Sequence, residues 1–191
     1  MYKSIFAGIA LSAAAAAMTT GAFAQSYTVD PRHTHVTWSV NHFGASTFRG
    51  KLNKTSGKVV LDPAGKTGSV EIVVDPTGNL SGDERLDKHL QTEDFFNPAK
   101  FATATFKSTK VEFNGSTPSK IDGNLTLLGV TRPLTLTVIS FNCKLHPMLK
   151  KDFCGADATA TIKRSDWGMK FGVPNIGDDV KLDIAIEAMK D

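Results

Sequence analysis

The sequence predicts an all-β domain, an eight-stranded antiparallel barrel with a short helical insert at its mouth. Eight stretches alternate apolar and polar residues with a period of two, the pattern of strands that bury one face. Most of these stretches are joined by short segments rich in Gly, Pro and Asn, as in an antiparallel meander. Closing such a meander into a barrel removes exposed strand edges, and a two-sheet sandwich is the structural alternative.

The first strand is predicted over residues 33–43, where Val36, Trp38 and Val40 share one face and polar residues occupy the other. Six later strands show the same alternation, and their apolar faces would point into the barrel. They centre on residues 70–74, 102–107, 124–127, 134–138, 156–162 and 182–187.

The second strand, predicted over residues 48–61, carries one irregularity. Leu52 and Val59 have opposite parity, so both can face inward only if one extra residue is accommodated between them. A β-bulge at residues 55–57, which read Thr-Ser-Gly, would supply this change of phase.

A short helix is predicted over residues 84–90, in a charged insert that interrupts the strands. Leu86 and Leu90 lie one helical turn apart and can both face inward. Arg85 and His89 would then lie near a rim of positive charge. We expect the insert to lie over the open end of the barrel, although a simple cap with self-paired charges would fit the same residues.

Residues 1–24 have the form of a secretory signal peptide. Lys3 provides the positive start, residues 5–18 form an apolar run, and residues 22–24 read Ala-Phe-Ala, a small-x-small cleavage site. A transmembrane anchor would need about 20 apolar residues, and this run ends earlier. We therefore expect cleavage after residue 24, one mature domain over residues 25–191, and a periplasmic location.

Charge argues against a nucleic-acid partner. The formal net charge is +3, and it falls to +2 when Lys3 is removed with the signal peptide. Lysine and arginine are interspersed with aspartate and glutamate, so the sequence has no basic block of the kind that binds phosphate backbones.

Cys143 and Cys154 are the two cysteines of the chain. In an oxidising compartment an even count predicts a disulfide, and the spacing of ten intervening residues differs from the Cys-x-x-Cys of redox centres. A structural disulfide is therefore favoured over a redox site.

The histidines near the N-terminus raise a metal hypothesis. His33 and His35 share one face of the first predicted strand, and Asp30 lies close in sequence. A zinc site needs three or four converging ligands, and no further histidine is obviously near. We expect no metal site, and keep a metal-dependent hydrolase that uses these three residues as the alternative function. Signatures of a Ser-His-Asp triad, a phosphate loop or HExxH are missing from the sequence.

The predicted barrel interior contains many small residues, which leaves two outcomes open. At eight strands a barrel is either filled by its own side chains or holds one ligand. The small inward-facing residues are Ala102, Ala104, Gly123, Ala156, Ala158 and Ala160. An apolar interior beneath a positive rim would suit an amphiphile with a long chain inside and a polar head at the entrance.

Nine segments of the chain resemble the YceI-like family, in order and over essentially the whole mature length. These segments are residues 27–30, 35–38, 40–42, 48–50, 83–90, 94–96, 101–106, 123–133 and 162–168. The cysteine loop resembles a subset of that family, and Thr55 departs from the aromatic residue expected there. The resemblance implies a lipocalin-like, extended barrel that is periplasmic and binds polyisoprenoids, isoprenoid quinones or fatty amides, and it implies that dimers are common.

The expected function is therefore periplasmic binding, transport or storage of a long-chain amphiphile, without catalysis and without a cofactor. A transient membrane contact and a homodimer are further expectations. Arg85 and His89 would meet the polar head, and Phe95 would belong to an apolar gate. The expected ligand-binding residues are Trp38, Phe48, Arg85, His89, Phe95, Ala104, Phe106, Leu125, Leu136 and Ile184.

Overall fold

The computed structural model describes residues 24–191 as an all-β barrel with one short α-helix, which confirms the predicted fold class. Residues 1–23 of the predicted signal peptide lie outside the described residues. The elements are β1 (Gln25–Val29), β2 (His35–His42), β3 (Ser46–Leu52), β4 (Thr55–Asp62), β5 (Thr67–Val74), η1 (Pro76–Gly78), β6 (Asn79–Leu80), α1 (Glu84–Leu90), β7 (Ala104–Asn114), β8 (Thr117–Leu127), β9 (Val130–Leu145), β10 (Asp152–Lys163), η2 (Arg164–Trp167) and β11 (Ile176–Lys190). Within residues 24–191, no helix has the length and apolar character needed to cross a membrane.

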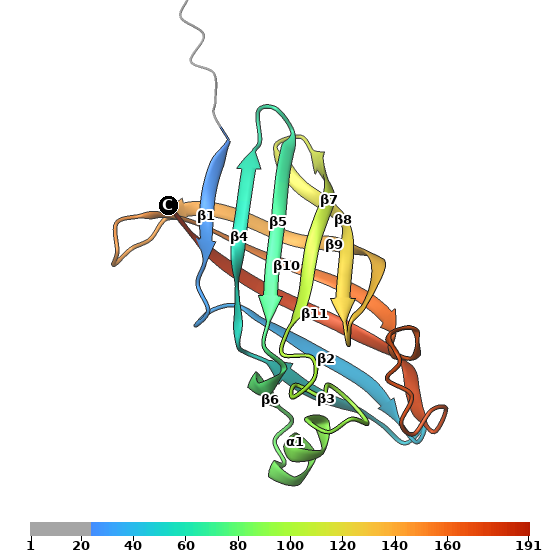
Figure 1. The fold of residues 1–191 in the computed structure, drawn as a ribbon. Coiled ribbons are helices and arrows are strands. Elements are labelled where there is room, and N and C mark those ends of the chain that lie inside the picture. The colour runs from blue at the N-terminus through green and yellow to red at the C-terminus, as the bar shows by residue number, and fades with distance from the viewer. Residues whose placement is uncertain (1–23) are drawn as a thin grey trace, which may run out of the picture.

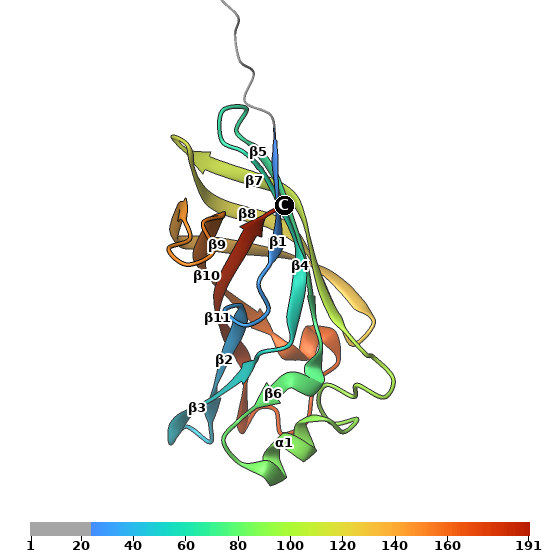
Figure 2. The same cartoon turned by 90° about the vertical axis from the view of Figure 1, so that its left-hand side faces the viewer.

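Eight strands close the barrel, in the order β1-β4-β5-β7-β8-β9-β10-β11 (Figures 1 and 2). The closing strand is β1, which pairs with β4 along one edge and with the end of β11 along the other. Thr28, for example, lies opposite both Lys58 and Met189. All of these pairings are antiparallel. Because β1 has a partner on both sides, the ring leaves no free strand edge at this end.

A second group of strands, β2, β3 and β6, extends the barrel toward α1. The first half of β11 pairs with β2 rather than with β1, as at Lys181 opposite Ser39. β3 continues from β2, and the two-residue β6 pairs with β3. The long strand β11 therefore belongs to the wall at both ends of the molecule, and Figure 1 shows α1 at the end opposite β1.

The predicted set of eight strands was wrong in its membership. The sequence prediction omitted β1, because five residues with two buried positions give a weak periodic signal. It also joined β3 and β4 into one strand with a bulge at residues 55–57. In the structure the chain leaves β3 after Leu52 and enters β4 at Thr55, and the β4–β5 register is continuous. The change of phase is thus produced by two separate strands with different neighbours.

Thr55, where an aromatic residue was expected, is buried and forms a side-chain hydrogen bond. Its hydroxyl donates to the Thr34 carbonyl oxygen at 2.8 Å. The Thr34 hydroxyl in turn contacts the backbone of Glu187, at 3.2 Å from its carbonyl oxygen and 3.0 Å from its nitrogen. These bonds connect the start of β4 to β11 across the loop that follows β1.

The predicted helix is confirmed with its bounds, since α1 covers Glu84–Leu90. The side chain of Asp83 caps it by accepting from the Leu86 nitrogen at 2.9 Å. Leu90 is buried and Leu86 is half-buried, so both lie on the inner face as expected. The prediction of a strand from residue 102 was wrong at its start, because β7 begins at Ala104 and Ala102 is exposed.

Side chains fill the end of the barrel that β1 closes. Tyr27, Leu61, Cys154 and Ala188 form one buried cluster there, with Phe113, Phe141 and Val59 packed against it. A second cluster around Phe106, Leu136 and Ala158 occupies the middle. Of the two outcomes left open by the sequence, a filled interior is found at the end that β1 closes. The other end, toward α1, contains a cavity.

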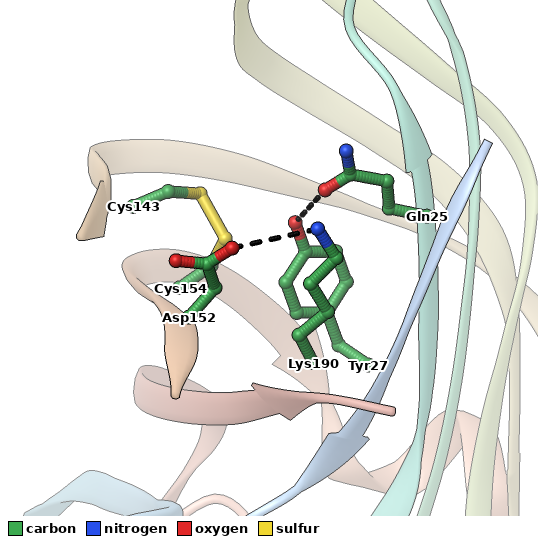
Figure 3. Close-up of a disulfide and its surroundings, with 6 residues drawn as sticks. All are labelled: Gln25, Tyr27, Cys143, Asp152, Cys154 and Lys190. Carbon is green, nitrogen blue, oxygen red and sulfur yellow. Dashed lines mark hydrogen bonds and ion pairs between the residues drawn. A yellow bond between two sulfur atoms is a disulfide. The ribbon is translucent and has the colours of Figure 1, made fainter. Parts of the chain in front are cut away.

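The predicted disulfide is confirmed. Cys143 of β9 and Cys154 of β10 lie opposite each other in the sheet and are bonded (Figure 3). Beside them Lys190 Nζ lies 3.4 Å from Asp152 Oδ2, and the Tyr27 hydroxyl donates to Gln25 at 2.8 Å. The bond covalently closes the hairpin that joins β9 to β10.

Replacing both cysteines by serine should lower the free energy of unfolding by about 3 kcal/mol, because the unfolded chain regains the entropy of a short loop. Urea denaturation of the variant and of the oxidised protein measures the difference. Addition of reductant should then shift the midpoint of the native protein only. A midpoint that is the same with and without the disulfide would contradict this role.

Candidate functional site

A cavity of about 190 Å³ lies inside the barrel, beneath α1. Its walls come from strands, from α1 and from the segment after α1. The lining residues are Val36, Trp38, Val40, Leu52, Ile72, Val74, Pro76, Leu90, Phe95, Phe96, Ala104, Thr105, Phe106, Leu125, Leu127, Leu134, Leu136, Ile162, Arg164, Met169, Ile176, Val180, Leu182 and Ile184.

The chemistry of this lining is apolar, apart from Thr105 and Arg164. Such a cavity offers water almost no hydrogen-bond partners, and apolar cavities of similar size stay dry and accept apolar guests. Left empty, a cavity of this volume would cost about 5 kcal/mol, at about 24 cal/mol per Å³. That cost is comparable with the whole stability of many domains, about 5–15 kcal/mol.

Small residues account for part of the cavity volume. Ala104 lines the cavity where a larger strand residue would fill it. Gly50 and Gly123 act differently, because each leaves space for an aromatic ring of the wall. A Cβ on Gly50 would collide with the indole of Trp38, and a Cβ on Gly123 would lie 2.5 Å from the ring of Phe106. The glycines therefore let these rings lie against the sheet.

A chain of buried and partly buried hydrogen bonds attaches α1 to the cavity wall. Trp38 Nε1 of β2 donates to Asn79 Oδ1 of β6 at 2.8 Å. Asn79 Nδ2 donates to Asp87 Oδ1 of α1 at 3.3 Å, and the Ser81 nitrogen donates to the same oxygen at 2.7 Å. Because Asn79 is 3% exposed, its amide has few alternative partners.

The segment after α1, which we call the gate, forms the cavity wall nearest the helix. It comprises residues 91–101 and turns back on α1, since the Phe96 nitrogen donates to the Leu90 carbonyl oxygen at 3.0 Å. Phe95 is buried, and its ring lies 5.4 Å from that of Phe171. The gate is a loop without a strand partner, and turn hydrogen bonds within residues 89–101 hold its shape.

Arg164 is the charged residue of the lining, and it is 3% exposed. Its guanidinium donates to three backbone carbonyl oxygens, those of Gly177 at 2.9 Å, Met169 at 3.1 Å and Ile176 at 2.9 Å. Burial lowers the pKa of Arg164, and the nearby carboxylate of Asp178 opposes that shift. The side chain therefore holds the 164–177 loop against the barrel.

The structure places seven of the ten predicted site residues on the cavity wall. They are Trp38, Phe95, Ala104, Phe106, Leu125, Leu136 and Ile184. Phe48 packs beside Trp38, with ring centroids 6.0 Å apart, and is not among the lining residues. Arg85 and His89 also lie outside the lining. Arg164 was missed as a cavity residue although its segment belongs to the resemblance, because an arginine in a turn gives no signal of burial.

The charges near α1 pair locally. Lys88 Nζ lies 2.7 Å from Glu84, and His89 Nε2 lies 2.9 Å from Asp94. Arg85 is exposed and makes no ion pair within residues 24–191. Lys88 and His89 thus each have a carboxylate partner, and Arg85 has none within the described residues.

The residues that lie close enough to hold a metal ion differ from the predicted set. His33 Nδ1 lies 2.7 Å from Asp30 Oδ2 and 3.9 Å from Glu187 Oε2, the single group in residues 24–191 that could hold an ion. His35 is not part of it, because β2 begins there and His33 lies in the preceding turn. None of the three residues lines the cavity.

Comparisons with known proteins agree with this architecture. The model of the YceI-like domain matches residues 27–188. A UPF0312 protein of Shewanella sp. (strain W3-18-1) is 36% identical over 174 residues, which cover 88% of this chain and 90% of the relative.

Two solved structures share the fold. A YCEI protein of Campylobacter jejuni is 25% identical with a TM-score of 0.68, covering 79% of this chain and 90% of that one. A polyisoprenoid binding domain of Saccharophagus degradans, implicated in plant cell wall breakdown, is 14% identical with a TM-score of 0.61, covering 87% and 99%. At that identity the second likeness concerns the fold alone.

Replacing Asn79 by Ala should lower the free energy of unfolding by about 1–3 kcal/mol, because the buried indole N–H of Trp38 loses its acceptor. Urea denaturation followed by tryptophan fluorescence measures this. Asn142→Ala, on an exposed position of β9, is the matched control and should change little.

A double-mutant cycle with Trp38→Phe tests the bond itself. Since both single changes remove the same hydrogen bond, the double variant should be more stable than the sum predicts, by about 0.5–3 kcal/mol. Strict additivity would mean that Asn79 acts without Trp38.

Proposed function

The chain belongs to the YceI-like family, and from this premise and the cavity we propose that it binds the hydrocarbon tail of a long-chain amphiphile inside the barrel. The observation that carries the proposal is the apolar lining beneath α1. Each methylene moved from water into such a lining contributes about 0.8 kcal/mol. A tail would also replace the empty volume, so the same contacts stabilise the complex and the fold.

The ligand class that fits is a polyisoprenoid, an isoprenoid quinone or a fatty amide. The polyisoprenoid binding domain of Saccharophagus degradans has the same fold, which supports this class by analogy. A cavity of about 190 Å³ holds a section of such a tail, so the remainder would occupy space that the gate opens. Phe95 and Phe96 would move for this, since they lie in a loop of the wall.

The polar head would lie near α1, where the unpaired Arg85 offers a positive charge. His89 would take part only by exchanging its bond to Asp94 for one to the ligand. We propose transport or storage in the periplasm as the role, and a homodimer as the assembly, as the family resemblance implies.

We propose binding rather than catalysis. The two polar residues of the lining are Thr105 and Arg164, and the guanidinium of Arg164 already donates to three carbonyl oxygens. A hydrolytic centre needs a nucleophile and a base within hydrogen-bond reach of each other. The lining offers no such pair within the described residues.

Native mass spectrometry of the protein purified without detergent, followed by organic extraction, tests the proposal. We expect a bound species with a long hydrocarbon tail, which the extract releases. Delipidated protein should recover it from added polyprenyl phosphate or ubiquinone, and its Tm should then rise because the ligand binds only the folded state. Protein that is empty and refuses both probes would contradict the proposal.

Ala104→Phe provides the matched variant, because it places a ring in the cavity from β7. It should abolish tail binding and should also remove the rise in Tm on addition of ligand. Lys107→Phe adds the same ring on the outer face of the same strand and should bind normally. Equal binding by both variants would show that the tail lies elsewhere.

A further inference from the structure

The loop between β9 and β10 exposes three large apolar side chains. We call residues 144–151 the tip; it contains Leu145, Met148 and Leu149, which are 57%, 82% and 58% exposed. Scattered apolar residues are common on protein surfaces, but three within five positions of one turn form a patch. Figure 1 shows this loop projecting beyond the barrel wall, near the C-terminus and away from α1.

The tip is positively charged. It contains Lys144, Lys150 and Lys151, and no aspartate or glutamate. The nearest carboxylate in sequence is that of Asp152, and Lys190 Nζ lies 3.4 Å from it (Figure 3). Three lysines around three apolar side chains thus remain without a counter-charge inside the tip.

Hydrogen bonds close the tip into a compact turn. The His146 nitrogen donates to the Lys151 carbonyl oxygen at 2.8 Å, and the Lys150 nitrogen donates to the His146 carbonyl oxygen at 2.9 Å. His146 Nδ1 accepts from the nitrogens of Met148 and Leu149, at 3.3 and 3.1 Å. The disulfide closes the hairpin below the tip. A surface that is already ordered loses little conformational entropy when it binds.

We propose that the tip docks on the surface of an anionic phospholipid bilayer. Apolar side chains flanked by lysines are the pattern of interfacial membrane contacts, because the apolar groups enter the headgroup boundary while the ammonium groups stay at the phosphates. Each lysine near an anionic surface strengthens binding by a factor of about five. The tip supplies both interactions at one projecting point.

Charge complementarity favours this partner over a second copy of the chain. In a two-fold dimer through the tip, the same three lysines of each copy would face one another. Like charges in such an interface oppose association, whereas lipid phosphates attract them. The docking also does not depend on what the cavity binds, since no tip residue lines the cavity.

Sedimentation with vesicles tests the docking. Vesicles of phosphatidylethanolamine and phosphatidylglycerol should bind the protein, vesicles of pure phosphatidylcholine should bind it far less, and 0.5 M salt should weaken binding through screening. Replacing Met148 and Leu149 together by Asp should reduce the partition coefficient by at least about ten-fold. Binding of the cavity ligand, measured on the same variants, should stay unchanged, so the two proposals can fail separately.

The tip offers matched controls elsewhere in the chain. Lys150→Gln should weaken partitioning about five-fold, while Lys66→Gln, at another exposed turn lysine with the same φ of 52°, should have no effect. Phe43→Asp removes a 62% exposed ring from the β2–β3 turn and should also have no effect. The proposal is overturned if vesicles do not bind, if the tip and control variants behave alike, or if the Asp variant instead dissociates a dimer or a complex with an acidic protein.

Discussion

An apolar void inside a folded barrel is the constraint on which the rest of this structure depends. Water gains little by entering it, and leaving it vacant costs about 5 kcal/mol, which is comparable with the total stability of many domains. Under the proposed function, the wall has to be rigid enough to resist collapse, and one part of it would yield to the guest. The structure divides these tasks between the sheet and the segment that contains α1.

The two ends of the barrel show this division. Where β1 closes the ring, Tyr27 and its neighbours pack the interior, and this packed end can support a hollow one. At the other end β2 and β3 extend the wall, and α1 is attached through the side-chain hydrogen bonds of Asn79, a residue of β6, which pairs with β3. Arg164 fastens the neighbouring loop by bonds to backbone carbonyl oxygens. The hollow end is thus covered by α1 and loops that side-chain hydrogen bonds help to hold, whereas a closed ladder of backbone hydrogen bonds surrounds the packed end.

Much of this could be predicted from the sequence where the signal is periodic or local. The alternation around Trp38 predicted the inner face of β2, and the spacing of Leu86 and Leu90 in a charged insert located α1. The membership of the ring could not be predicted, because β1 is short and the break between β3 and β4 imitates a bulge. Arg164 and Asn79 were missed for another reason: their roles come from partners distant in sequence, and no periodic pattern marks a buried polar residue.

The most direct test of the central claim is an electron-density map of the protein crystallised from a preparation that was never delipidated. We expect continuous, elongated density between the side chains of Trp38 and Phe106, reaching the gate at Phe95. A cavity closed by side chains that meet across the barrel axis, or one filled with mutually hydrogen-bonded waters, would contradict the account.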